Sequence, residues 1–161
     1  MTLPLGDLEM IERLLLAALI GALLGIEREW RHKTAGLRTN ILIAVGSATF
    51  TLMSIEFASG VQGADPGRVA AQIVTGIGFL GAGAIMRTDS GIHGVTTAAT
   101  VWANAALSVA VGGGQYHLAA IGVVVTLTVL LVLHPIEIAL ERHVRRPHYR
   151  RAGDNDRLTD A

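Results

Sequence analysis

Three glycines in the run TGIGFLGAG (residues 75–83) have the G-x-G-x-x-G spacing that cradles the phosphates of a dinucleotide. That chemistry requires a strand before the glycines, a helix that begins at them and an acidic residue about 20 residues further on. Here the glycines lie inside one continuous apolar segment, and no Asp or Glu occurs between Asp89 and Glu137. The run instead favours a membrane helix in which small residues allow close packing. The packing glycines expected here are Gly76, Gly78, Gly81 and Gly83.

The first apolar segment carries a similar pattern of small residues. Ala17, Gly21 and Gly25 follow one another at intervals of four, so they lie on one face of a helix. Lipid tails provide no hydrophobic drive between helices, and small residues let helix backbones approach each other. We therefore expect the face that holds Gly21 and Gly25 to pack tightly on a neighbouring helix.

Polar side chains form a stripe in the fourth apolar segment. Thr97, Thr100, Asn104 and Ser108 share one helical face, and Gln72 and Thr75 are polar residues of the preceding segment. One interpretation is hydrogen bonding between helices, worth about 0.6 kcal/mol per contact. The other is a polar path or site for an ion or small solute, with Asn104 near the middle of the membrane.

Charged residues gather where the first apolar segment ends and the second begins. Glu27 and Arg28 come first, followed by Arg38 and Thr39 at the start of the second segment. An Arg beside a helix N-terminus can bind an anion, because the free N–H groups already favour negative charge. An ion pair between Glu27 and Arg38 that braces the turn is the alternative interpretation.

Asp65 and Arg68 begin the third apolar segment. An Asp at such a position is most often a helix N-cap. A lone Asp can also help to hold a hydrated magnesium ion, because Mg²⁺ keeps several waters and needs only one or two carboxylates. Asp65 is therefore the one metal-ligand candidate.

The sequence does not predict an enzyme. It contains no cysteine, no nucleophile elbow and no histidine pair at metal-ligand spacing. Its formal net charge is zero, so no overall field favours nucleic acid as a partner. We expect no cofactor, with Mg²⁺ as the candidate ligand or substrate.

The elements that must position these side chains are membrane helices. The 161 residues are 51% hydrophobic and 16% charged, with a mean hydropathy of +0.49, and a chain this short cannot hide so much apolar surface in a soluble core. A bilayer core needs roughly 17–25 helical residues. The fold expected is an all-α integral membrane protein whose five apolar segments span about 8–26, 37–58, 69–86, 95–111 and 118–133, the last closed by Pro135.

The distribution of Lys and Arg predicts the orientation of these helices. Basic residues concentrate in the loop after the first segment and after residue 141, which places both in the cytoplasm and the N-terminus outside. Residues 1–144 then form the membrane domain. The basic tail 145–161 has almost no large apolar residues and is expected to be disordered.

Four blocks of sequence, in order, resemble the bacterial MgtC/SapB membrane family. They are GIERE (25–29), AGLRTN (35–40), DPGRVAAQIVTGIGFLGAGAIM (65–86) and HGVTTAATVWANAA (93–106), within a match over residues 14–116. The family has Gly-Leu-Thr-Thr where this chain has Val95 in the second position. The resemblance assigns the motif to Glu27, Arg28, Gly36, Arg38, Thr39, Asp65, Arg68, Gln72, Gly76, Gly78, Gly81, Gly83, Thr96, Thr97 and Trp102.

The resemblance implies a bacterial inner-membrane protein linked to magnesium limitation, acid stress and virulence. Many members continue into a soluble cytoplasmic domain, whereas this sequence ends at Ala161, so we expect the membrane domain alone. Two hypotheses follow: a regulator of other membrane complexes that acts through its helix faces, and a transporter of magnesium or another small solute that uses the stripe with Gln72. A homodimer in the lipid bilayer is expected for either.

Overall fold

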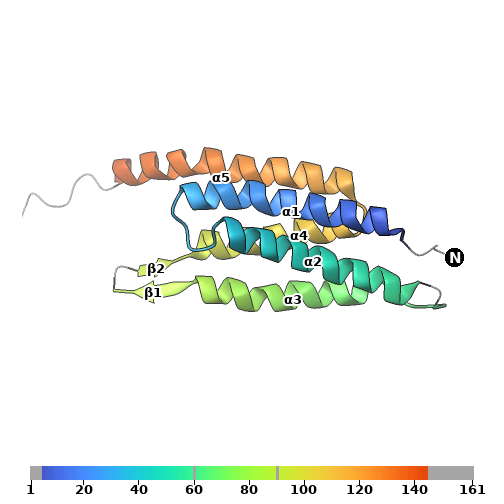
Figure 1. Cartoon of the computed structure of the whole chain (residues 1–161). Helices are drawn as coiled ribbons and strands as arrows, with labels where there is room; N and C mark the ends of the chain where they lie inside the picture. Colours follow the sequence, from blue (N-terminus) through green and yellow to red (C-terminus); the bar gives the residue numbers. More distant parts are fainter. Residues whose placement is uncertain (1–4, 60, 90, 145–161) are drawn as a thin grey trace, which may run out of the picture. The chain divides into compact units, whose positions relative to one another are not determined.

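The computed structural model describes residues 5–59, 61–89 and 91–144, and the tail expected to be disordered lies outside these residues. In the described residues five helices follow one another, with one short hairpin between the third and the fourth (Figure 1). They are α1 (Asp7–Trp30), α2 (Leu37–Ala58), α3 (Gly67–Ala84), β1 (Met86–Thr88), β2 (Gly91–His93), α4 (Val95–Gly112) and α5 (Tyr116–Val144).

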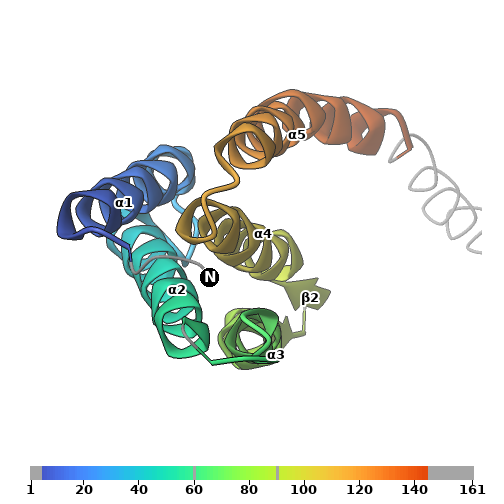
Figure 2. The same cartoon turned by 90° about the vertical axis from the view of Figure 1, so that its right-hand side faces the viewer.

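The chain divides after Val124 into two compact units. The first holds α1 to α4, the hairpin and the beginning of α5, and the second holds the rest of α5. In the first unit α1, α2 and α4 all pack on one another, and α3 packs on α2 and α4 (Figure 2). Small and branched side chains fill this core, among them Ala17, Leu24, Ala44, Ala48, Val101 and Ala105.

The apolar side chains that do not fill the core face outward. On α1 the exposed large residues are Leu8, Ile11, Leu15, Leu19, Leu23, Ile26 and Trp30. So much exposed apolar surface is unfavourable in water and suits a lipid environment. Three helices of the described chain are long and apolar enough to cross a membrane: α2, α4 and the Tyr116–Leu133 part of α5. The all-α membrane class is confirmed, while membrane crossing by α1 and α3 stays a prediction.

The third helix ends earlier than expected. Helix α3 ends at Ala84, and Met86 begins a hairpin in which Met86 pairs with His93, Arg87 with Ile92 and Thr88 with Gly91. The hairpin was not expected from the sequence. It leads into α4 through Gly94, whose φ of 88° is left-handed and therefore favours glycine.

The fifth helix ends later than expected. Pro135 does not close it, because α5 continues to Val144 with Pro135 inside. Proline removes one backbone hydrogen bond from a helix, but membrane helices tolerate it where the freed carbonyl finds another partner. The expected end at this proline is therefore wrong.

Candidate functional site

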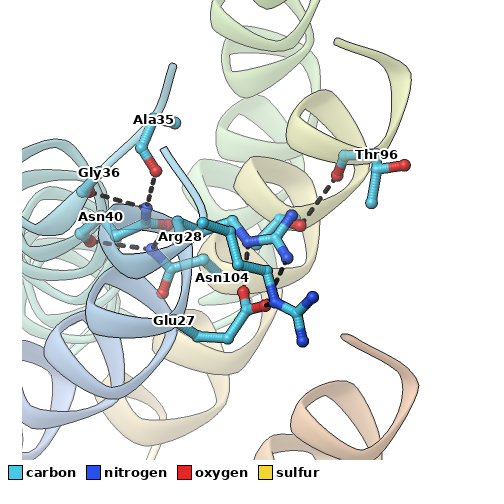
Figure 3. A network of polar contacts seen from close by, with 9 residues as sticks. Glu27, Arg28, Ala35, Gly36, Asn40, Thr96 and Asn104 are labelled. Carbon is cyan, nitrogen blue, oxygen red and sulfur yellow. Dashed lines mark hydrogen bonds and ion pairs between the residues drawn. The ribbon is translucent and has the colours of Figure 1, made fainter. Parts of the chain in front are cut away.

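A buried charged group lies at the end of α1. This helix extends to Trp30, past the predicted end, and so includes Glu27 and Arg28. Their exposed fractions are only 7% and 3%. The Arg28 guanidinium donates two hydrogen bonds to the Glu27 carboxylate, one of them at 2.8 Å, and Arg31 makes a further ion pair with the same carboxylate (Figure 3). One carboxylate thus pairs with two guanidinium groups, and the group carries a net positive charge.

The ion pair predicted between Glu27 and Arg38 is not formed. Glu27 pairs instead with Arg28 of α1 and with Arg31, the residue that follows the end of α1. Arg38 and Thr39 are both exposed on α2. The longer α1 decides this, because it places Arg28 in the same helix as the carboxylate and Arg31 at its C-cap, one turn further on.

The start of α2 already has an anion. The Glu29 side chain accepts a hydrogen bond at 3.0 Å from the backbone N–H of Leu37, the first residue of α2. A carboxylate here satisfies a free N–H group and interacts favourably with the helix dipole. The anion site predicted at this N-terminus beside Arg38 is therefore occupied by the protein's own Glu29. A side chain at Gly36 would collide with that carboxylate.

Two buried asparagines connect α2 and α4. Asn104 donates from Nδ2 to the backbone oxygen of Asn40 at 2.8 Å and to its Oδ1 at 3.2 Å (Figure 3). The Asn40 amide in turn donates to the carbonyls of Ala35 and Gly36, at 2.7 and 2.9 Å. Both asparagines are fully buried. This pair fixes the register of α2 against α4 and the geometry of the turn before α2.

The predicted stripe on α4 is buried as one face. Thr97, Thr100, Asn104 and Ser108 all lie in the interior. The hydroxyls of Thr100 and Ser108 donate at 2.8 Å to the carbonyls four residues earlier in the same helix. Both hydroxyl protons are thus used within α4. The Thr100 and Ser108 oxygens can then only accept hydrogen bonds from neighbouring groups.

A second polar face, on α2, is also buried in this interior, and the sequence pattern had not been recognised as such a face. Its members are Asn40, Ser47, Thr51 and Ser54, all buried. Their intervals of seven, four and three place them on one helical face, which is the signal that could have found them. Thr51 donates to the Ser47 carbonyl, and Ser54 donates to the Pro66 carbonyl at 2.7 Å, which ties α2 to the start of α3.

Arg13 is a further buried polar residue that was not predicted from the sequence. Its side chain is buried in α1, donates from Nη1 to the carbonyl of Gly112 at 2.6 Å and pairs with Glu9. Gly112 is the last residue of α4, where free carbonyls attract a cation. Arg13 therefore joins the beginning of α1 to the end of α4. An arginine one turn after a glutamate was the sequence signal, although it gave no hint of burial.

Asp65, Arg68 and Gln72 lie around the start of α3, which is at the opposite end of the first unit from the end of α1 (Figure 1). All three are exposed and line a cleft of 480 Å³. The Asp65 carboxylate accepts a hydrogen bond at 2.8 Å from the N–H of Gly67, where α3 begins. Gln72 is thus on an open surface, whereas the stripe of α4 is buried. No group of three potential metal-ligating side chains occurs in the described part of the chain.

The predicted packing glycines fall into two groups. Gly21 and Gly25 lie against the backbone of α2, and Gly81 lies against Ala98 of α4. Gly76, Gly78 and Gly83 have no neighbouring atom within 4 Å of the position that a Cβ would take. No described part of the chain therefore packs against these three glycines.

The fold and the site define a small helical membrane protein whose core is held by a buried polar network. The sequence profile of the MgtC family matches residues 14–139, and the chain belongs to that family. No solved structure matches the chain.

Curated relatives of known name share about half of the aligned residues. The chain is 47% identical over 137 residues to "Putative magnesium transporter YhiD" of Escherichia coli K12, covering 82% of this chain and 64% of that protein. It is 48% identical over 123 residues to protein MgtC of Salmonella typhimurium, covering 76% and 52%. For protein MgtC of Brucella abortus the identity is 48% over 131 residues, covering 81% and 53%. The chain thus spans about half to two thirds of the length of these relatives.

Proposed function

We propose that this chain is a regulator of other membrane proteins under magnesium limitation or acid stress, of the kind that aids survival in a host. It acts by binding partners in the bacterial inner membrane as a multi-pass protein, and it catalyses no reaction. Its N-terminus is outside and its C-terminus is in the cytoplasm. The family match and the magnesium-related name of one relative support the link to magnesium.

The observation that carries this proposal is that the buried donors of Asn104, Thr100 and Ser108 all bond inside the protein. Asn104 bonds Asn40, and the hydroxyls of Thr100 and Ser108 bond carbonyls of their own helix. The Asn104–Asn40 contact holds α4 and α2 together in lipid, where a hydrogen bond between helices is worth about 0.6 kcal/mol. A core built in this way supports a rigid scaffold that presents its outer surface.

The surface that suits a partner is the open face of α3, defined by Ala71, Thr75, Gly78 and Ala82. These residues recur at intervals of four, three and four, and all are exposed. Small side chains allow another helix to approach closely, and Thr75 can donate a hydrogen bond to it. A second copy of this chain, giving a homodimer, and a helix of another membrane complex both fit this face.

Transport of magnesium or another small solute is the second candidate. It is favoured by the Asn104 Oδ1 atom, which is buried and has no hydrogen-bond partner. Glu27 provides a buried carboxylate on α1. Oxygen ligands of this type suit Mg²⁺.

Two assays separate the candidates. The first measures Mg²⁺ flux into proteoliposomes that hold the wild-type protein, the Asn104→Leu variant or no protein. The second measures growth in low magnesium of a bacterium that lacks its own family member and carries the wild type or the Gly78→Leu variant. We expect no protein-dependent flux, and loss of growth support with Gly78→Leu, because a bulky side chain blocks the open face of α3.

The matched control is Gly83→Leu, which also adds a side chain into free space but lies off that face. We expect Gly83→Leu to support growth. Flux that requires Asn104 would overturn the regulator proposal in favour of transport. Full growth support by a correctly inserted Gly78→Leu variant would show that the open face of α3 is not the partner surface.

A further inference from the structure

Two clefts join along the boundary of α2 and α3. The first, of 480 Å³, lies where α3 begins and is lined by Ser54, Phe57, Asp65, Arg68, Val69 and Gln72 among others. The second, of 450 Å³, lies further along the helices and includes Leu42, Gly46, Phe50, Gly76 and Leu80 in its lining. Val69 and Gln72 line both, so the two clefts form one groove with a charged end and an apolar end. Each volume is in the range of about 300–1,000 Å³ typical of ligand sites.

The charged end carries two opposite charges. Arg68 offers a guanidinium, whose forked donors match the oxygens of a phosphate. Asp65 uses Oδ1 to accept from the N–H of Gly67 at 2.8 Å, and a carboxylate has a second oxygen that can accept from a ligand. A ligand with both a phosphate and an ammonium group is complementary to this pair.

The apolar end has the length of one acyl chain. The groove extends along α3 from Val69 to Leu80. With a rise of 1.5 Å per residue this is about 16 Å, or about half of the 30 Å hydrocarbon core of a bilayer. A single leaflet has that thickness. The absence of side chains at Gly46 and Gly76, where a Cβ would meet nothing within 4 Å, keeps the groove open.

The groove on the other side of α3 shares Ile73 and Ile77 with the apolar end of the α2–α3 groove but has no charged end. It measures 310 Å³ and lies between α3 and α4, with Ala70, Val74, Trp102, Ala106 and Val109 in its wall. None of its lining residues is charged. It offers nothing to a headgroup, which sets the α2–α3 groove apart from a general lipid-facing surface.

We propose that the α2–α3 groove is a binding site for one phospholipid with a primary ammonium headgroup. The phosphate binds Arg68, the ammonium donates to Asp65, and one acyl chain lies along Gly46 and Gly76. This site is independent of the open face of α3 and of whether the protein regulates or transports.

The test is native mass spectrometry of the purified protein with an equimolar mixture of phosphatidylethanolamine and phosphatidylglycerol that have the same acyl chains. We expect wild type to retain one phosphatidylethanolamine in preference to phosphatidylglycerol, and Gly76→Leu and Gly46→Leu to reduce retention at least tenfold. Gly78→Leu is the matched control, because it also enters free space on α3 but does not line the groove. It should retain lipid as wild type does.

Two further variants test the headgroup contacts. Arg68→Gln should lose retention of both lipids, because both carry the phosphate. Asp65→Asn still accepts the Gly67 N–H and should keep binding while losing the preference for phosphatidylethanolamine. Equal loss in Gly76→Leu and Gly78→Leu, a wild-type preference for phosphatidylglycerol, or an unchanged preference in Asp65→Asn would each overturn the proposal.

Discussion

Replacement of Gly21 by alanine tests whether the close approach of α1 to α2 holds the membrane domain together. A Cβ at Gly21 would lie 2.6 Å from the Asn40 backbone oxygen, 2.8 Å from the Ile41 Cα and 2.9 Å from the Ala44 Cβ. Carbon atoms prefer separations of about 3.5–4.0 Å, so the two helices would have to move apart by about 1 Å. Two of the three atoms belong to the backbone and cannot rotate away.

The expected cost follows from two opposing effects. Overpacking of a tight core costs about 1–3 kcal/mol, whereas alanine in place of glycine within a helix returns up to about 1 kcal/mol. We therefore expect Gly21→Ala to lower the free energy of unfolding by about 1–2 kcal/mol. The Asn40 oxygen that the new methyl group would meet also accepts the 2.8 Å hydrogen bond from Asn104, so this contact would lengthen.

The measurement is unfolding of the purified protein in mixed micelles by titration with sodium dodecyl sulfate, followed by circular dichroism. Gly78→Ala is the matched control: it makes the same chemical change on a helix, but its Cβ meets no atom within 4 Å. It should be as stable as wild type or up to about 1 kcal/mol more stable. If Gly21→Ala equals or exceeds Gly78→Ala in stability, the close approach does not constrain the helices and the reasoning is refuted.

The same unfolding assay tests three more residues. Glu27→Gln should cost about 3–5 kcal/mol, because it leaves buried Arg28 without its counter-charge, and a cost below 1 kcal/mol would contradict the assignment. Asn104→Leu should cost about 1–3 kcal/mol, since the fully buried site loses its hydrogen bonds to Asn40 and receives a larger side chain, and wild-type stability would show that the pair is not a structural link. Arg13→Met should cost about 1.5–3 kcal/mol, because it keeps the apolar stem but removes the hydrogen bond to Gly112, and the exposed Glu12→Gln is its control.

Much of the fold follows from composition and periodicity. Runs of apolar residues separated by Gly, Pro and charge predicted five helices, and α2 and α4 begin at the residues expected. The hairpin at Met86–His93 could not be predicted, because a six-residue pairing has no periodic signal of its own. The helix end predicted at Pro135 was wrong, because proline weakens a helix without always terminating it.

The sequence by itself determined which residues are polar within apolar segments and which of them share a helical face. The stripe from Thr97 to Ser108 and the small face of Gly21 and Gly25 are of this kind, since helical periodicity depends only on spacing. Only the tertiary structure decided the partners. It paired Glu27 with Arg28 and Arg31 rather than with Arg38. It also placed Asn40 opposite Asn104 and left Gln72 exposed, apart from the buried stripe. Contacts between helices depend on rotation and register, and a one-dimensional pattern does not contain these quantities.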